Sequence, residues 1–486
     1  MRKKIVCLIL AMVLVLTSSA MVVGAAQPDR TYTYEETTPV PSTNAYQVKM
    51  VVDEFVMGTT KMNNPRDIFV DNEDRIFIMD AGNCRVLVLD QNYKCIKELK
   101  EFNYNGEILT LAEGAQGIFY RSQNQMLYIA DTENNRVIVT DLDGKVARVQ
   151  GKPEDELLDP TTPYKPQKII VDNMGIMYVT SGTVNTGAML VDSANNFLGF
   201  YGTNKLKMTA AMQMEFFWRS ILSDAMNARS QVSFQPVEFN NLFWSEDRFV
   251  YTVSPLVDSV ASSVSKLNAL GTNVFLEDID IYKISTDRKI KGMILTDITV
   301  DNEGAITLVE STTGRLFQYD EGCNLLSVFG GLGYQKGLFT QPVSIENDSK
   351  NGLLVLDAGK SNITVMEQTF YGQMIRSANR LYNDGLYQES IEPWMEVLRM
   401  NANYTQAYVG LGKAYISMGE YKEAMEYFKL GDNQEGYGEA KALLRDEIIR
   451  KNFGLVAAIV ILLLITVLFY EKISDTISRI YWRIRK

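Results

Sequence analysis

The chain of 486 residues contains no histidine, and this absence excludes several classes of enzyme at once. Without an imidazole the chain can build no Ser–His–Asp or Cys–His nucleophilic site, no histidine general base and no His-ligated zinc. The sequence also has no glycine-rich phosphate-binding loop and no C-x-x-C motif. We therefore predict no catalytic residue, no cofactor and no metal site.

An excess of basic charge is also missing. The chain has 48 Lys and Arg residues against 59 Asp and Glu residues, which gives a net charge of −11. Proteins that bind nucleic acid obtain most of their affinity from a basic face. We therefore predict no nucleic-acid partner. The hydrophobic fraction of 46% is sufficient for packed cores, and the length predicts two or three domains of roughly 100–200 residues each.

Cysteine is scarce, with four residues in the whole chain. Cys84 and Cys95 flank a predicted hairpin centred on residues 91–92, whose register would set Cys95 opposite Val88. Two cysteines in that register are not neighbours across the strands and cannot form a disulfide. The sequence therefore predicts free thiols.

A long apolar run follows a basic start at the N-terminus. Residues 2–4 are basic, residues 5–16 are apolar, and small residues stand at 24–26. This order is typical of a secretory signal peptide. We predict a signal peptide over 1–26, cleaved near Ala26, with an uncleaved membrane anchor as the alternative, and a linker over 27–45.

A second apolar run stands near the C-terminus. Residues 453–470 carry no charge over eighteen positions, close to the roughly 20 residues that span a bilayer. The tail, 471–486, has five basic residues and two acidic ones. The positive-inside rule places such a tail in the cytoplasm. The sequence thus predicts a single-pass protein of the cell membrane whose bulk is extracytoplasmic.

Between these runs a short phrase recurs, as "DAGNCRVLVLD" (80–90), "DTENNRVIVTD" (131–141) and "ESTTGRLFQYD" (310–320). In each copy an acidic residue is followed five places later by Arg. The acidic side chain can accept backbone N–H groups in the turn and pair with the Arg that opens the next strand. We predict structural pairs, not catalytic ones, at three positions: Asp80 with Arg85, Asp131 with Arg136, and Glu310 with Arg315.

The phrase belongs to a longer unit of short alternating strands that occurs six times. Equivalent positions are separated by 50, 51, 72, 57 and 47 residues, counted along Asp71, Arg121, Asp172, Trp244, Asp301 and Asp348. Repeats of this length with several strands each are typical of propeller blades. The sequence predicts an all-β six-bladed propeller over 46–370, in which 46–56 supplies the last strand of the last blade and closes the ring.

The longest interval holds an inserted segment, 207–230, whose pattern predicts a helix. Its methionines and aromatic residues cover more than one face. They either pack against the propeller or form an adaptable docking surface, for which Phe216 and Trp218 are the candidates.

The repeat unit resembles that of the NHL-repeat family of six-bladed β-propellers. The resemblance rests on the pattern of Asp131, Asn135, Arg136 and Val137, from which the copy at residues 80–86 departs only at Cys84. It covers roughly residues 60–370. The third and fourth blades lack the Arg.

After the propeller the pattern becomes helical, with two segments that align at an offset of 34 residues. The matching pairs include Gly385 with Gly419 and Trp394 with Phe428. This period is that of tetratricopeptide repeats, so 371–452 is predicted to be two such repeats and a capping helix over 435–453. Trp394 and Phe428 are assigned to the core. By analogy, the partner-binding groove would hold Asn379, Tyr382, Asn383, Lys413 and Ile416.

Two functions remain open. The combination of domains resembles exported, membrane-anchored NHL–tetratricopeptide proteins of Gram-positive bacteria, which implies a non-catalytic scaffold or sensor that binds a protein or a carbohydrate-related ligand beside an ABC-type transporter. The alternative is a lactonase or hydrolase that holds a divalent ion in the propeller channel through Glu, Asn and Asp. Because one fold serves both functions, the fold by itself does not decide between them.

Overall fold

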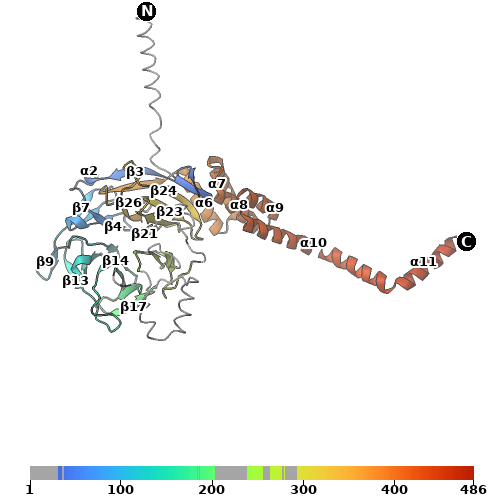
Figure 1. The fold of residues 1–486 in the computed structure, drawn as a ribbon, viewed down its shortest axis with the longest axis horizontal. Helices are drawn as coiled ribbons and strands as arrows, with labels where there is room; N and C mark the ends of the chain where they lie inside the picture. The colour runs from blue at the N-terminus through green and yellow to red at the C-terminus, as the bar shows by residue number, and fades with distance from the viewer. Residues whose placement is uncertain are drawn as a thin grey trace, which may run out of the picture. The chain divides into compact units, whose positions relative to one another are not determined.

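The computed structural model describes residues 31–35, 38–182, 184, 186–202, 238–254, 263–275, 279 and 293–485. The chain divides into two compact units, Met1–Arg376 and Ser377–Lys486. The described part of the first unit is all-β apart from short helical turns and the start of helix α6 (Figure 1). The second unit is helical.

The first unit is a six-bladed β-propeller built from antiparallel sheets. Each blade begins with its innermost strand, and these strands neighbour one another in a closed ring, in the order β4, β10, β14, β18, β21, β25 and again β4. The first three blades are β4 to β7 (Pro65–Val70, Ile76–Asp80, Arg85–Leu89, Cys95–Leu99), β10 to β13 (Ile118–Arg121, Met126–Asp131, Arg136–Thr140, Val146–Gln150) and β14 to β17 (Pro166–Val171, Met177–Ser181, Ala188–Val191, Phe197–Tyr201). The last three blades are β18 to β20 (Asn241–Trp244, Val250–Val253, Val264–Leu267), β21 to β24 (Leu295–Val300, Ile306–Glu310, Arg315–Tyr319, Leu325–Gly330) and β25 to β27 with β3 (Pro342–Asn347, Leu353–Asp357, Asn362–Gln368, Tyr46–Val52). A small hairpin, β8 and β9 (Phe102–Tyr104, Glu107–Leu109), connects the first blade to the second.

The ring closes as the sequence predicts, because β3 pairs antiparallel with β27 from Ile363↔Val52 to Gln368↔Tyr46. This pairing joins residues more than three hundred positions apart and covers the edge that β27 would otherwise expose. The strand is shorter than the predicted 46–56, because Asp53 caps a helical turn, α2 (Glu54–Met57), by accepting the N–H groups of Phe55 and Val56.

The stretch predicted as a linker contains a hairpin. β1 (Thr31–Glu35) pairs with β2 (Thr38–Ser42), and Thr31 and Tyr32 of β1 pair with β24, so the fifth blade becomes a six-stranded sheet. The alternating "TYTYE" segment satisfies the otherwise open edge of β24. This part of the linker prediction is therefore wrong.

Two details of the predicted register also need correction. The turn after β6 spans Asp90 to Lys94, with Tyr93 in the left-handed region at φ +63°, so Cys95 faces Leu89 and not Val88. Cys84 and Cys95 are nonetheless free thiols, as predicted. In the fourth blade the position equivalent to Asp71 is Ser245, since its N–H bonds the carbonyl four residues on, as in the first, third, fifth and sixth blades; the sequence alignment placed it one residue early, at Trp244.

Apart from the short α2, the described α-helices follow the last blade. They are α6 (Phe370–Asn383), α7 (Tyr387–Met400), α8 (Thr405–Met418), α9 (Tyr421–Leu430), α10 (Gln434–Leu468) and α11 (Tyr470–Ile484). Trp394 and Phe428 are buried, as predicted. A Cβ on Gly410 would meet the Trp394 ring at 2.5 Å, and one on Gly412 would meet the Phe428 ring at 2.7 Å. The small residues therefore let neighbouring helices approach closely over these aromatic rings.

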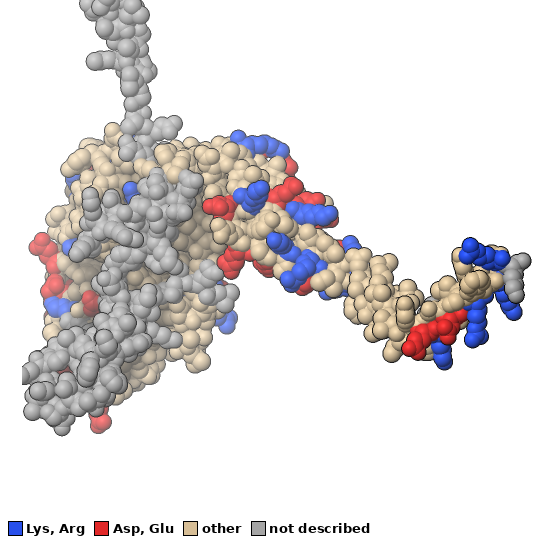
Figure 2. All heavy atoms as spheres, turned by 45° about the vertical axis from the view of Figure 1, so that its right-hand side comes forward, with Lys and Arg blue, Asp and Glu red and all other residues tan. Residues whose placement is uncertain are grey.

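The predicted capping helix and the apolar run form one continuous helix, α10. It is 35 residues long, and its apolar window, with a mean hydropathy of 2.4, is not buried against any described residue. Figure 2 shows this stretch free of charged side chains. One long apolar helix of this kind fits a single-pass membrane anchor.

Candidate functional site

The structure brings together two of the predicted acidic–Arg pairs, at the turns between the second and third strands of the first two blades, here called the blade corners. Arg85 Nε donates to Asp80 Oδ2 at 2.6 Å, and both side chains are buried. Arg136 Nε donates to Asp131 Oδ2 at 2.7 Å, and its side chain keeps 20% of its exposure. Each aspartate also accepts a backbone N–H from the segment before its blade, Asn63 for Asp80 and Ala112 for Asp131. The pairs therefore fasten blade corners.

In the third copy Glu310 accepts the N–H groups of Ile294, Thr312 and Thr313. The guanidinium of Arg315 lies over the Tyr32 ring, 5.5 Å from its centroid. Glu310 and Arg315 are register partners on β22 and β23. The carboxylate thus shares with the other copies the N–H from the segment before its blade, and it adds two N–H groups of its own turn.

A fourth copy was missed by the sequence comparison. Asp357 accepts the N–H groups of Thr340 and Gln341 and faces Asn362 in the register position that Arg occupies elsewhere. The signal in the sequence is the residue before the Arg position, which is small or polar in every copy and has a left-handed backbone conformation. Asn135, Gly314 and Ser361 have φ between +56° and +68°, and Cys84 stands there at +51°. The corner is defined by this backbone and not by Arg alone.

The centre of the propeller contains a polar ring that no sequence motif marks. The ring consists of equivalent positions near the start of the six innermost strands. Asp67, Lys168, Asp297 and Ser344 are the third residues of β4, β14, β21 and β25, Gly117 directly precedes β10, and Asn241 is the first residue of β18. Lys168 Nζ donates to both oxygens of Asp67, at 2.8 and 2.9 Å. Ser344 Oγ donates to Asp67 at 3.0 Å and to Asp297 at 2.5 Å.

Glycine is required at the second position of this ring. A Cβ on Gly117 would lie 2.2 Å from the carbonyl oxygen of Gln167 and 2.9 Å from the Cα of Lys168. The missing side chain lets β10 and β14 approach, so that Lys168 can reach across to Asp67. Because Ile118 N also donates to Asp67, the ion pair spans three blades.

The environment of the channel favours the protonated form of two of its carboxyl groups, Asp297 and Glu346. Burial, reinforced by the neighbouring carboxylate of Asp67 and opposed by Lys168, raises the pKa of Asp297 to about 6. Glu346 lies two residues after Ser344 on β25. Burial raises the pKa of Glu346 well above its ordinary value; Lys168 opposes this shift, and Asp297 and Asp67 reinforce it. The single buried ammonium group of Lys168 thus interacts electrostatically with three buried carboxyl groups, those of Asp67, Asp297 and Glu346. In the described part of the chain, no group of three or more His, Cys, Asp or Glu side chains is arranged to hold a metal ion.

Next to this ring, the channel widens into a mouth of about 750 Å³ that all six blades line. The first-hairpin turns form its rim, and acidic residues at the start of these turns accept turn N–H groups, as Asp71 does from Glu73 and Arg75. One carboxylate oxygen of the acidic turn "DNED" (71–74) is therefore engaged by the backbone of its own turn. The Asp71 carboxylate also pairs with Arg75.

The wall of the mouth is divided chemically. Aromatic side chains come from the first, second and fourth blades, and the residues are Phe69, Phe119, Tyr120, Phe243, Trp244 and Tyr251. The fifth and sixth blades supply Thr299, Glu346 and Asn347, and Asn347 Nδ2 donates to Thr299 Oγ1 at 2.6 Å. The buried Oδ1 of Asn347 has no hydrogen-bond partner in the protein. The mouth therefore has aromatic residues on one part of its wall and polar groups on another. Phe69, Phe243 and Trp244 are the half-buried members of the aromatic set, and the other three are buried.

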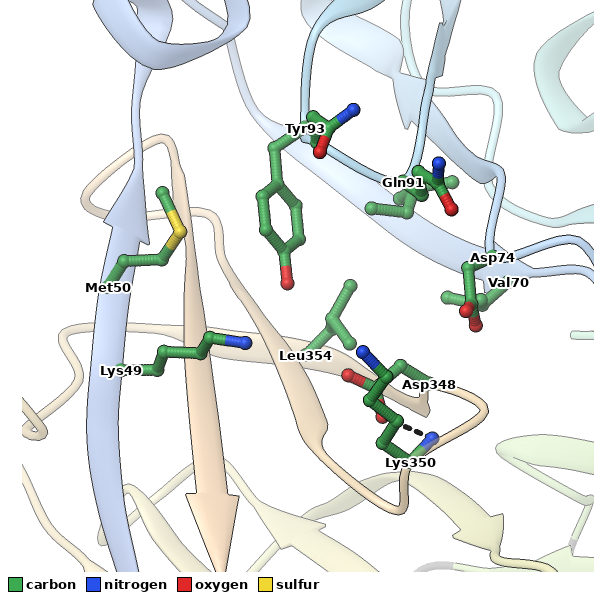
Figure 3. A pocket seen from close by; sticks show the side chains of 11 residues that line it. Lys49, Met50, Val70, Asp74, Gln91, Tyr93, Asp348, Lys350 and Leu354 are labelled. Carbon is green, nitrogen blue, oxygen red and sulfur yellow. Dashed lines mark hydrogen bonds between the residues drawn. The ribbon is translucent and has the colours of Figure 1, made fainter.

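A second hollow, of about 500 Å³, lies between the sixth and first blades (Figure 3). Lys49 of β3 and Lys350 of the β25–β26 turn border it, and the phenol of Tyr93 points into it from the first blade. Burial, reinforced by Asp348 and Asp74, raises the pKa of Tyr93. Two lysines and two aspartates, Asp74 and Asp348, border the hollow, so it favours neither an anionic nor a cationic ligand.

The predicted groove residues of the helical unit are only partly accessible. Asn383 and Lys413 are exposed, whereas Asn379 and Tyr382 are half-buried, with Tyr382 5.3 Å from the Tyr387 ring centroid. Ile416 packs against the cluster of Ala424, Phe428 and Ala440. Phe216, Trp218, the inserted segment 207–230 and the predicted signal peptide lie outside the described residues.

The fold places the chain among the β-propellers, with a C-terminal helical region that contains one long apolar helix. Comparison with protein-family models and with curated protein sequences gives no match. The chain is similar in structure to virginiamycin B lyase from Staphylococcus aureus (10% identity, 67% of this chain and 100% of that one, TM-score 0.40). It is also similar to a protein of unknown function from Bacteroides thetaiotaomicron (12%, 70% and 91%, 0.40) and to the WD40 β-propeller domain of Doa1 (9%, 68% and 99%, 0.38). Similarities this low support no argument about activity.

Proposed function

We propose that this protein is a membrane-anchored, extracytoplasmic binding protein that acts as a scaffold or sensor, not as a catalyst. An NHL-type propeller would bind a ligand at its channel mouth. Tetratricopeptide-like helices would contact a protein partner, and α10 would cross the cell membrane once, with the basic C-terminus in the cytoplasm. The observation that carries the proposal is the mouth itself, to which all six blades contribute.

A carbohydrate-related ligand fits this mouth. A sugar ring presents a flat apolar face that packs on aromatic side chains, and hydroxyl groups that donate to carboxylate and amide oxygens. Trp244 stands on the aromatic side, and Glu346 and Asn347 stand on the polar side. Many polar groups of the wall are already engaged in turns, so the free acceptors are few and would set the orientation of the ligand.

Titration of oligosaccharides into the full chain in lipid nanodiscs tests the proposal. Trp244→Ala and Asn347→Ala should each weaken binding at least about tenfold, since each removes a buried contact worth roughly 1.4 kcal/mol or more. Tyr334→Ala, at a side chain that is 90% exposed and not part of the mouth, is the matched control. Equal affinity in all variants would refute the mouth as the site. Consumption of the sugar would instead favour the hydrolase alternative.

The partner of the helical region is proposed to be a protein, with an ABC-type transporter as the first candidate. This part rests on the domain resemblance. Purification of the anchored protein from its native membrane, with and without Lys413→Glu and Asn383→Ala, identifies the partner directly. Recovery of the same partner by both forms would remove these residues from the interface.

A further inference from the structure

The segment after the apolar helix is a helix of its own, α11, with two unlike faces. It begins at Tyr470, directly after Phe469, whose φ of −111° and ψ of 15° end α10. Figure 1 shows that α11 leaves the direction of α10 at this point. The predicted basic tail is therefore an ordered element and not an extended chain.

One face of α11 is apolar and uncovered. Ile477, Ile480, Tyr481 and Ile484 are spaced i, i+3, i+4 and i+7, which places them in one stripe along the helix. Their exposed fractions run from 53% to 81%. A stripe of this kind is unfavourable in water, because the free-energy cost of hydrated apolar surface grows with its area.

The opposite face carries the positive charge. Lys472, Arg479 and Arg483 follow the same 3.6-residue period on the side away from the isoleucines. Over residues 470–485, which are the helix and its C-cap, four basic residues stand against Glu471 and Asp475, a net charge of 4 − 2 = +2. Tyr481 and Trp482 add aromatic side chains that prefer the level of the lipid headgroups.

We propose that α11 lies along the surface of the membrane, with its isoleucine stripe in the lipid and its basic face on anionic headgroups. This inference rests on the proposed role of α10 as the membrane span. The continuity of the chain supports it, because the apolar part of α10 ends at Leu468 and α11 starts two residues later, at the boundary of the bilayer. Lys and Arg side chains near an anionic surface are attracted to it electrostatically.

Spin labels on the full chain test this placement. Single cysteines are introduced as Ile477→Cys and Ile484→Cys on the apolar stripe, Thr476→Cys and Ser478→Cys as matched polar-side controls, and Val460→Cys in α10, after the native cysteines are replaced by Ser. In nanodiscs of phosphatidylglycerol and phosphatidylcholine, labels at 477 and 484 should be accessible to oxygen and shielded from a water-soluble nickel chelate. Labels at 476 and 478 should show the reverse.

The outcomes separate the two proposals. With the label at 460 in the bilayer, chelate access at 477 equal to that at 478 overturns the surface helix and leaves the anchor intact. Shielding of 477 and 484 from both reagents points to a protein surface or a second copy and also overturns it. Chelate access at 460 removes the anchor itself. Replacing phosphatidylglycerol by phosphatidylcholine, or making Arg479→Gln with Arg483→Gln, should reduce the contrast; an unchanged contrast contradicts the role of anionic lipid.

Discussion

At the scale of single residues, buried charge in this propeller fixes geometry. Arg85 is enclosed by Asp80, Glu98 and Thr60, and Lys168 is enclosed by Asp67 with Asp297 and Glu346 nearby. Removing ions from water is costly, and each pair offsets that cost only when every polar atom is satisfied. An arrangement of strands that separated these partners would leave buried charges unpaired, so the blade corner and the channel favour the observed arrangement.

The corner pairs should differ in how much they stabilise the fold. We expect Arg85→Ala to lower the free energy of unfolding by about 3–5 kcal/mol, because it strands buried Asp80. Arg136 is one-fifth exposed, so Arg136→Ala should cost less, between that range and the roughly 0–1 kcal/mol of an exposed pair. Denaturant unfolding measures both, with exposed Arg66→Ala as the control. Unchanged curves for Arg85→Ala, Arg136→Ala and Arg315→Ala would show that the phrase does not serve stability.

The channel carboxyls should make the fold less stable as pH rises. The pKa values of Asp297 and Glu346 are higher in the folded chain than in the unfolded one, so the folded state binds protons that the unfolded state has released above about pH 4. Stability is therefore greatest below the unfolded pKa and falls as pH rises through about 6, the pKa of Asp297.

Glu346→Gln tests this sign, since the amide keeps the shape and cannot ionise. The variant should lose less stability than the parent between pH 5 and pH 8 in thermal unfolding. Exposed Glu107→Gln should follow the parent. If Glu346→Gln and the parent have the same pH dependence, the carboxyl is not the group that holds the proton.

At the scale of elements, the N-terminal strand β3 decides whether the propeller is closed. It completes the sixth blade against β27, and Gln318 of the fifth blade donates to the phenol of its first residue, Tyr46, at 2.9 Å. Hairpin β1–β2 instead extends the outside of the fifth blade through two paired residues. We therefore expect β3 to contribute more to the stability of the propeller than the β1–β2 hairpin does.

Deleting residues 46–56 should leave β27 with unpaired backbone groups and cause aggregation or a loss of cooperative unfolding. Size-exclusion chromatography and thermal unfolding of the deletion variant measure this. Deletion of residues 31–42 is the control and should have the smaller effect. A variant without 46–56 that unfolds like the parent would refute the role of β3 as the closing strand.

At the scale of the whole molecule, an acidic propeller, a helical region and an apolar helix follow one another along the chain. The uncovered apolar surface of α10 is the feature that water does not tolerate. The excess of basic residues after it, against the net negative charge of the whole chain, orients the proposed anchor with its C-terminus in the cytoplasm.

Protease added to intact protoplasts should therefore degrade the propeller and the helical region and leave a small C-terminal fragment. An epitope at the C-terminus follows the fragment, and permeabilised protoplasts serve as the control in which it disappears. Survival of the full-length chain in intact protoplasts would contradict the orientation.

The sequence by itself determined the elements whose signal is local or repeated. Alternating strands in six similar units predicted the blades, and 46–56 predicted the closing strand, because strand periodicity and edge pairing are readable along the chain. The turn chemistry of Asp80 and Asp131 was readable for the same reason. The hairpin of β1 and β2 was not, because the fifth blade already has its four strands and the repeat leaves no vacant strand position for it.

Only the tertiary structure decided the chemistry of the channel. Its six axial positions are occupied by Asp, Gly, Lys, Asn, Asp and Ser, which have no common residue type for a sequence comparison to detect. Asp67 and Ser344 are 277 positions apart, and they meet because the ring closes. Interaction energies between charges depend on distance and burial, and neither exists until the blades are assembled. The repeat in the sequence therefore predicted the positions of the strands along the chain, whereas the closed ring determined which side chains contact each other in the channel.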